Sequence, residues 1–268
     1  MTTFNLLLVA LIQGITEFLP VSSSGHLILL PYLTGLEDQG VTIDIAAHLG
    51  TLIAVILYFW ADVRSALWGT LRLVRGKVDT QGAFLALCLL IATIPVIIAG
   101  FILKLTGIDD VIRDNITIIA AAFIFFGLVL YWADQSKPVT KTAEQWSLKD
   151  AVIMGLWQVL ALIPGTSRSG ITITGARALG YARTDAARLA MLMSIPTIIA
   201  AGALAGLDLI GNPDAPAMRD VAIVTVFSFI AAMLALTLMM RLLKSVSYTP
   251  YVIYRVVLGV ILLAVSFT

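Results

Sequence analysis

The segment from Gln13 to His26, QGITEFLPVSSSGH, contains an acid, three consecutive serines and an imidazole in a stretch that is otherwise apolar. Ionisable groups at membrane depth are costly and usually functional, which singles out Glu17 and His26. A carboxylate, a hydroxyl and an imidazole together suit nucleophilic displacement with acid–base help. The structural alternative is that the serines only cap helices and the histidine only bonds a carbonyl.

The spacing of this segment predicts how its side chains converge. Gln13 and Glu17 are four positions apart, so they lie on one face of a helix, and Pro20 ends or redirects that helix. The next helix is expected to be capped by one of three serines, Ser22, Ser23 or Ser24. Its free N–H groups and its dipole favour an anion beside His26, which falls in the first turn.

A second polar stretch, PGTSRSG at residues 164–170, surrounds a guanidinium with hydroxyls. An unpaired Arg168 inside a bilayer would be very costly, so it needs a carboxylate or an anionic ligand. Glu17 is the structural partner to consider. The abundance of neighbouring donors favours an anionic ligand instead, and these donors are Thr166, Ser167, Ser169 and Thr172.

The remaining polar residues point to no other chemistry. We expect Asp44 and His48 at the membrane interface, with His48 within reach of the site. The chain contains no phosphate-binding loop, zinc-protease, CxxC or dinucleotide fingerprint.

Composition sets the class of protein. Sixty per cent of the residues are hydrophobic, only 12% are charged, and the mean hydropathy is +1.00. A soluble domain is nearer to half apolar and about a quarter charged. We therefore predict an all-α integral membrane protein with one membrane domain, the lipid bilayer as partner and no nucleic acid. The single cysteine, Cys88, excludes a disulfide framework and a thiolate metal site.

The elements that must position these groups follow from hydropathy. A helix needs about 20 apolar residues to cross a bilayer. Six stretches meet or approach that length, at about 41–61, 82–104, 115–133, 185–209, 220–241 and 249–267. Two further apolar regions, 4–34 and 150–180, are interrupted by proline, glycine and serine. We expect each to form a re-entrant hairpin of two half-length helices, because irregular backbone at that depth must be buried or line a wet cavity.

The two interrupted regions resemble each other. IQGITEFLPVSSSGH aligns with WQVLALIPGTSRSG, with Gln13 over Gln158 and Ser24-Gly25 over Ser169-Gly170. Each half then contains one hairpin followed by three crossings, so the second half is inserted upside down relative to the first. This predicts an inverted-topology repeat, with repeat one at about 1–133, a cytoplasmic linker at about 134–149 and repeat two at about 150–268.

Loop charges predict the orientation. Basic residues concentrate in 62–81, 134–150 and 242–248, whereas the opposite loops are acidic or sparse in charge. The positive-inside rule places the basic loops in the cytoplasm. The first hairpin then enters from the outer face, the second enters from the cytoplasmic face, and the C-terminus lies outside.

At this point both hairpins resemble a known family. QGITEFLPVSSSGH matches the signature [E/Q]xxxE…PVSSxGH, and PGTSRSGIT matches PGxSRSxxT, of the undecaprenyl pyrophosphate phosphatases, also known as bacitracin-resistance proteins. The similarity runs along nearly the whole chain. Gln13 stands where many members have Glu, so Glu17 alone supplies a carboxylate.

The resemblance implies hydrolysis of undecaprenyl diphosphate to the monophosphate and phosphate, which recycles the lipid carrier of peptidoglycan synthesis and confers bacitracin resistance. It also implies a divalent cation, Mg²⁺ or Ca²⁺, held by Glu17, and a bacterial inner-membrane protein whose site opens toward the periplasm. On this basis the expected catalytic residues are Glu17, Ser23, His26 and Arg168. The expected phosphate-binding residues are Ser22, Ser24, Ser167, Ser169, Thr172 and Gln13.

Several alternatives stay open from the sequence. Ser23, His26 or water is the nucleophile. A transporter or flippase of the polyprenyl phosphate carrier is the alternative function, because broken helices at the midplane also serve transport. A homodimer and the preferred chain length of the lipid are left open too.

Overall fold

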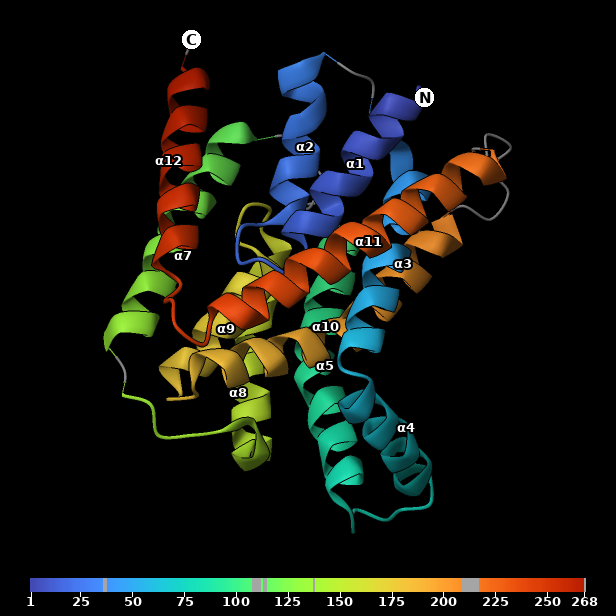
Figure 1. Ribbon diagram of the computed structural model, residues 1–268, viewed down its shortest axis with the longest axis vertical. Helices are drawn as coiled ribbons and strands as arrows, with labels where there is room; N and C mark the ends of the chain where they lie inside the picture. The colour runs from blue at the N-terminus through green and yellow to red at the C-terminus, as the bar shows by residue number, and fades with distance from the viewer. Residues whose placement is uncertain (36–37, 108–111, 113–114, 137, 209–216, 268) are drawn as a thin grey trace.

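The computed structural model describes residues 1–35, 38–107, 112, 115–136, 138–208 and 217–267 (Figure 1). Within these residues the chain is helical and its only β-type pairing is an isolated bridge between Lys141 and Tyr181. The helices are α1 Thr3–Thr16, α2 Ser23–Thr34, α3 Gly40–Tyr58, α4 Trp60–Val74, α5 Gln81–Thr106, α7 Ile116–Ser136, η1 Ala143–Gln145, α8 Leu148–Val159, η2 Leu160–Leu162, α9 Arg168–Ala178, α10 Arg183–Asp208, α11 Met218–Leu242 and α12 Thr249–Val265.

Five of the described helices are long and apolar enough to cross a membrane: α3, α5, α7, α10 and α11. They coincide with the first five predicted crossings. The sixth predicted crossing is α12, a 17-residue apolar helix slightly shorter than the others. The chain is therefore an all-α, multi-pass membrane protein, as predicted.

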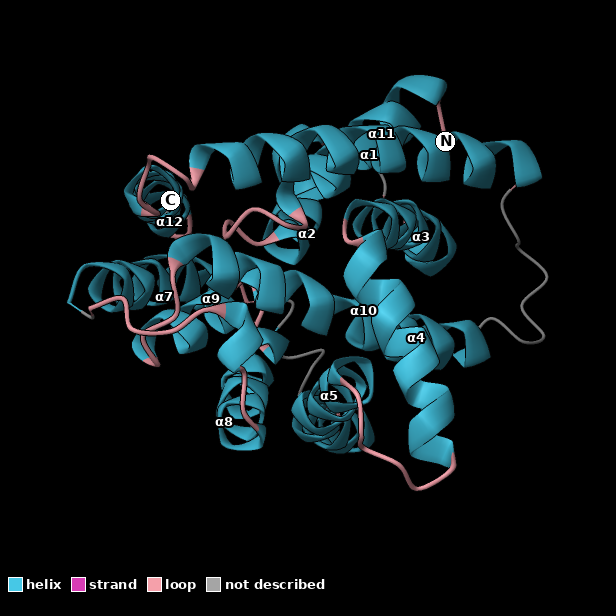
Figure 2. Ribbon diagram, turned by 60° about the horizontal axis from the view of Figure 1, so that its bottom comes forward, coloured by secondary structure: helices cyan, strands magenta, loops and turns pink. Residues whose placement is uncertain are grey.

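The stretch 62–81, predicted as a basic cytoplasmic loop, is mostly helix. A short kink at Phe59, with φ −101° and ψ 33°, separates α3 from α4, which continues to Val74. Figure 2 shows α4 leaving the end of α3 toward α5. The two helices approach closely because Gly69 faces Gly82, where a Cβ on Gly69 would lie 2.1 Å from the Gly82 carbonyl oxygen. The prediction of a loop was wrong. The basic residues of this stretch belong to an amphipathic helix, and its small residue Gly69 packs on α5.

The two interrupted regions form broken helices, as predicted. The first helix stops at Thr16, and the chain turns through residues 17–22 before α2 begins at Ser23. In the second region, α8 and η2 end at Leu162, and α9 begins at Arg168. We call residues 17–22 the first break and residues 163–167 the second break. The two breaks lie side by side near the middle of the molecule, where Ser169 donates a 2.9 Å hydrogen bond to the Leu19 carbonyl (Figure 1).

Close packing by small residues fixes the first broken helix. The long helix α11 crosses α1 and α3 in both views (Figure 1 and Figure 2). Gly14 of α1 and Gly50 of α3 allow this approach, since a Cβ on Gly50 would lie 2.3 Å from the Thr225 carbonyl oxygen. Substitution at either glycine would push the helices apart. The position of α1, and hence of Glu17, depends on these contacts.

A buried ion-pair network fixes the far end of α9. Asp134 of α7 accepts hydrogen bonds from Arg177 at 3.0 Å and from Arg183 at 2.8 Å. Its other oxygen accepts from the backbone N–H of Tyr248 at 3.3 Å. Such a pair is strongly destabilising to break, because an uncompensated buried charge is left behind. The network holds α7, α9, α10 and the start of α12 together, and so holds the helix that begins at Arg168.

Candidate active site

A cavity of about 170 Å³ lies between the two breaks. It is lined by eight residues, namely Glu17, Ser22, Ser23, Ser24, His48, Ala161, Ser167 and Arg168. Six of the ten predicted site residues therefore line one space, although they come from segments about 145 positions apart in the sequence. The two interrupted regions therefore meet at one cavity.

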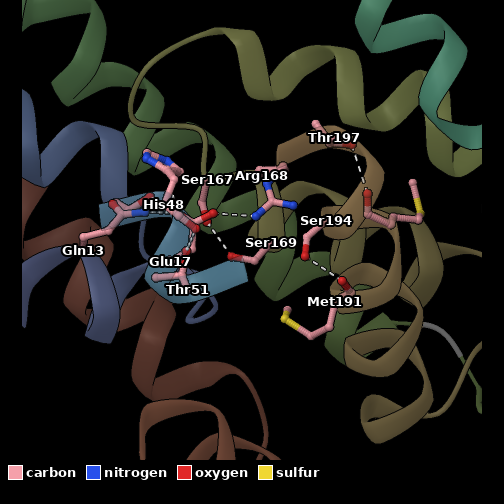
Figure 3. Close-up of polar contacts among 12 residues, drawn as sticks. Gln13, Glu17, His48, Thr51, Ser167, Arg168, Ser169, Met191, Ser194 and Thr197 are labelled. Carbon is pink, nitrogen blue, oxygen red and sulfur yellow. Dashed lines mark hydrogen bonds and ion pairs between the residues drawn. The ribbon is translucent and has the colours of Figure 1, made fainter. Parts of the chain in front are cut away.

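Glu17 is the centre of the polar contacts (Figure 3). One carboxylate oxygen, Oε1, accepts from Arg168 Nη2 at 2.5 Å. The other, Oε2, accepts from Ser23 Oγ at 2.6 Å and from Gln13 Nε2 at 2.9 Å. An ionised carboxylate is thus matched by three donors, one of them a cation, which favours the charged form in a buried place. The carboxylate is positioned to take the hydroxyl proton of Ser23.

The same backbone device starts the second helix of each hairpin. Ser22 and Ser167 have φ of 71° and 72°, the two positive values among described residues other than glycine. Each side chain caps its helix, because Ser22 Oγ accepts from the Gly25 N–H at 3.3 Å and Ser167 Oγ accepts from the Gly170 N–H at 3.1 Å. An unusual backbone conformation in a non-glycine residue costs about 1–3 kcal/mol and persists only where its surroundings impose it. These turns present Ser23 and Arg168 at the first positions of α2 and α9.

The guanidinium of Arg168 has an unused hydrogen-bond donor. Its Nη2 pairs with Glu17, whereas its buried Nη1 has no hydrogen-bond partner among the described residues. In Figure 3 the guanidinium lies between Glu17 and the α10 residues Ser194 and Thr197. A buried donor without a partner is expensive. The structural pairing with Glu17 therefore exists, and a further donor is available to an anionic ligand.

Three residues predicted to bind phosphate support the site from outside the cavity. Gln13 is buried and donates to Glu17. Ser169 donates to the Leu19 carbonyl and so joins the two breaks. Thr172 donates to the Arg168 carbonyl at 2.8 Å, within its own helix. In these contacts they position the lining residues, and their binding of phosphate remains a prediction.

One of the two histidines lines the cavity. His26 is outside the cavity lining, with Nδ1 2.6 Å from the Ser22 carbonyl oxygen and Nε2 2.6 Å from the Tyr254 hydroxyl. His48, expected at the interface but within reach of the site, lines the cavity with Nε2 3.9 Å from Glu17 Oε2. Sequence spacing could not reveal which face of α3 turns toward Glu17.

The lining offers one acidic residue to a cation. Glu17 already accepts three hydrogen bonds, and the described residues contain no group of three His, Cys, Asp or Glu side chains placed to hold a metal. Magnesium and calcium prefer several oxygen ligands. The side chains near the cavity therefore fit a cation that shares its oxygens with a bound phosphate better than one held by protein alone.

Comparison with known proteins shows the family of this chain. Residues 6–261 match the family described as "Bacitracin resistance protein BacA". The chain is 66% identical over 268 residues to the undecaprenyl-diphosphatase of Roseobacter denitrificans and 63% identical over 268 residues to that of Dinoroseobacter shibae, with full coverage of both chains in each comparison. It is 43% identical over 259 residues to the undecaprenyl-diphosphatase of Hahella chejuensis, covering 97% of this chain and 96% of the other. This chain belongs to the bacitracin resistance protein BacA family.

Proposed function

We propose that this protein is an undecaprenyl-diphosphatase, which hydrolyses undecaprenyl diphosphate to undecaprenyl phosphate and phosphate. It thereby recycles the lipid carrier for peptidoglycan synthesis and confers resistance to bacitracin. The observation that carries the proposal is the Ser23 hydroxyl, 2.6 Å from the Glu17 carboxylate, in a cavity that also contains Arg168. The relatives that are 60–66% identical bear the name undecaprenyl-diphosphatase.

The first chemical step assigns Ser23 as nucleophile. Ser23 Oγ attacks the terminal phosphorus, Glu17 takes the hydroxyl proton, and the bond from phosphorus to the bridging oxygen breaks. Undecaprenyl phosphate leaves with the bonding electrons. Arg168 and the N–H groups at the start of α2 and α9 stabilise charge on the phosphoryl oxygens.

The second step releases phosphate and restores the enzyme. Water attacks the phosphoserine, the bond from phosphorus to Ser23 Oγ breaks, and Glu17 returns its proton to that oxygen. Both protons of the attacking water leave with the phosphate group. Ser23 is favoured over His26 as nucleophile because both ring nitrogens of His26 are hydrogen-bonded outside the cavity lining. Direct attack by water is the alternative that mutation of Ser23 tests.

A divalent cation, Mg²⁺ or Ca²⁺, is part of the proposal. When bound, it neutralises charge on the diphosphate and on the leaving group. Glu17 is the acidic side chain of the lining that would contact it. The diphosphate oxygens would supply the other ligands, because three donors already occupy Glu17.

We propose the finer architecture from the same features. The 268 residues form one membrane domain of six crossings and two re-entrant hairpins in an inverted repeat, with residues 134–149 as cytoplasmic linker. Support comes from the matching capped turns at Ser22 and Ser167 and from Figure 1, in which the hairpins extend toward opposite ends of the molecule. The charge of the loops supports an inner-membrane orientation with the site toward the periplasm.

The partners follow from this placement. The isoprenoid tail of the lipid substrate lies in the bilayer while its diphosphate enters the cavity between the breaks. Formation of a homodimer is a separate prediction. Light scattering of the purified protein in detergent tests it.

The deciding experiment is phosphate release from undecaprenyl diphosphate by purified protein in detergent. No transmembrane gradient exists there, so release identifies hydrolysis and not transport. We expect multiple turnovers in Mg²⁺ or Ca²⁺ and strong inhibition by chelator. The absence of release by folded protein, with movement of the carrier in vesicles, would establish the transporter alternative instead.

A further inference from the structure

Arg255 in α12 is a buried cation bound to backbone carbonyls. Its side chain is 0% exposed, and it lies outside both sequence motifs of the site. Its described hydrogen bonds all go to carbonyl oxygens, at 3.0–3.3 Å, and these acceptors belong to Pro20, Ala122, Phe123 and Gly165. A planar guanidinium with five donors can reach several acceptors at once in a way that a lysine cannot.

Two of these acceptors belong to the two breaks. Nη1 donates to Pro20 at 3.3 Å, two residues before the Ser22 turn, and Nη2 donates to Gly165 at 3.0 Å, two residues before the Ser167 turn. One side chain therefore binds equivalent points of both breaks. Carbonyls released from regular helices at this depth need donors.

Glycines leave room for this arrangement. A Cβ on Gly170 would lie 2.9 Å from Arg255 Nη1, and a Cβ on Gly127 would lie 3.3 Å from Arg255 Cβ. Gly170 is in the first turn of α9, two residues after Arg168. The Arg255 guanidinium thus packs against the first turn of α9, which presents Arg168.

The preceding residue, Tyr254, contacts the first break in its own way. Its hydroxyl is 2.6 Å from His26 Nε2, and the two rings stack at 5.7 Å with an interplanar angle of 6°. A carbonyl oxygen only accepts, so His26 Nδ1 carries the proton in its bond to Ser22, and Nε2 accepts from Tyr254. Tyr254 thereby fixes the ring that holds the Ser22 carbonyl.

We propose that Tyr254 and Arg255 form a clamp that sets the distance between the two breaks, and hence the placement of Ser23 and Arg168 about Glu17. Both are positioning residues for the hydrolysis proposed above, on which this inference rests. Displacement of reacting groups by about 1 Å can cost about a hundredfold in rate. Loss of the clamp therefore lowers kcat more than it raises KM, because the lipid tail still binds.

The test measures kcat and KM of Arg255→Lys in two backgrounds. In otherwise wild-type protein we expect kcat to fall at least about tenfold with KM within about threefold. In Arg168→Lys protein, whose catalytic cation is already misplaced, the same change should cost less than about twofold, since effects of residues that act as a unit are not additive. Equal losses in both backgrounds, or wild-type kcat in folded Arg255→Lys, would overturn the clamp.

A matched control separates positioning from stability. Arg188 of α10 also makes several hydrogen bonds, but its partners are Asp62 of α4 and Glu144 of η1, and none of the three lines the cavity between the breaks. Arg188→Lys should lower the melting temperature while kcat per folded molecule stays within about twofold in both backgrounds.

A second variant covers the case in which Arg255→Lys fails to fold. Tyr254 is 46% exposed, so Tyr254→Phe should fold normally and keep the ring stack while losing the hydroxyl. We expect kcat to fall about fivefold, the scale of one hydrogen bond, with no further loss in a His26→Ala background. Wild-type kcat in Tyr254→Phe would remove Tyr254 from the clamp. If wild-type protein itself releases no phosphate, the proposed function fails first, so the two failures are distinguishable.

Discussion

The first and second breaks share a backbone conformation and differ in their side chains. Residue for residue, at an offset of 145, Ser22 matches Ser167 in φ and in helix capping. At the next position the first break has Ser23 and the second has Arg168. Five residues before the capping serine, the first has Glu17 and the second has the apolar Leu162. The chain uses one turn twice, and the proposed mechanism assigns the nucleophile and base to one copy and the cation to the other.

The largest effect should come from removing what is unique to the first break. Ser23→Ala is expected to lower phosphate release at least about a thousandfold, because the attacking oxygen is gone. The measurement is kcat of purified, monodisperse protein in detergent. The control is Ser245→Ala, which should match wild type, because among the described residues the Ser245 hydroxyl bonds the Leu242 carbonyl at the end of α11. Substantial turnover by Ser23→Ala would favour direct attack by water.

The second prediction makes the two turns alike. Arg168→Ser places a serine after each capping serine and leaves Glu17 without its cation. We expect kcat to fall about a hundredfold to a thousandfold, the scale of one lost charge-stabilising donor. Arg168→Lys should recover part of the loss, since it restores charge without the second donor. A folded Arg168→Ser protein with wild-type turnover would contradict the division of roles between the breaks.

The sequence predicts the two breaks and most of the crossings, because both depend on periodicity and residue type. The broken helices follow from Pro20 and the serine run. The cost of an unpaired charge in a membrane predicts that Arg168 needs a partner, and the structure shows Glu17 in that place, although the sequence favoured an anionic ligand. Five crossings follow from length and hydropathy alone. The α4 helix was missed because positive charge in a loop and positive charge on an amphipathic helix look alike in composition.

The parts of the site that could not be predicted depend on long-range packing. Spacing placed His26 beside Ser23, but the ring's direction is decided by Tyr254, 228 positions away. The place of His48 depends on the rotation of α3, which is set where Gly50 meets α11. In the sequence, Arg255 is the one charged residue of the apolar stretch 249–267, and its four carbonyl partners come together only when the breaks meet.

A third prediction concerns His26, whose counterpart in the second break is Ile171. If His26 only holds the Ser22 carbonyl, then Asn should replace it, because an amide N–H can occupy the place of Nδ1–H. We expect His26→Ala to lower kcat about tenfold and His26→Asn about fivefold, because Asn keeps the bond to the Ser22 carbonyl and loses the one to Tyr254. Losses of a thousandfold in both variants would instead identify His26 as the nucleophile.

The smallest expected effect tests the glutamines at matching positions in α1 and α8. Gln13 donates to Glu17, whereas the buried Gln158 has no partner for either amide atom among the described residues, since Leu162 stands where the first break has its acid. Gln158→Leu should therefore leave kcat unchanged and raise stability by about 1 kcal/mol, because an unsatisfied buried amide is removed. Gln13→Leu should lower kcat about fivefold, through the lost hydrogen bond to Glu17. Melting temperature and phosphate release measure both. Equal changes in kcat and melting temperature for the two variants would contradict this prediction. They would show that Gln158 has a role that does not depend on an acidic neighbour.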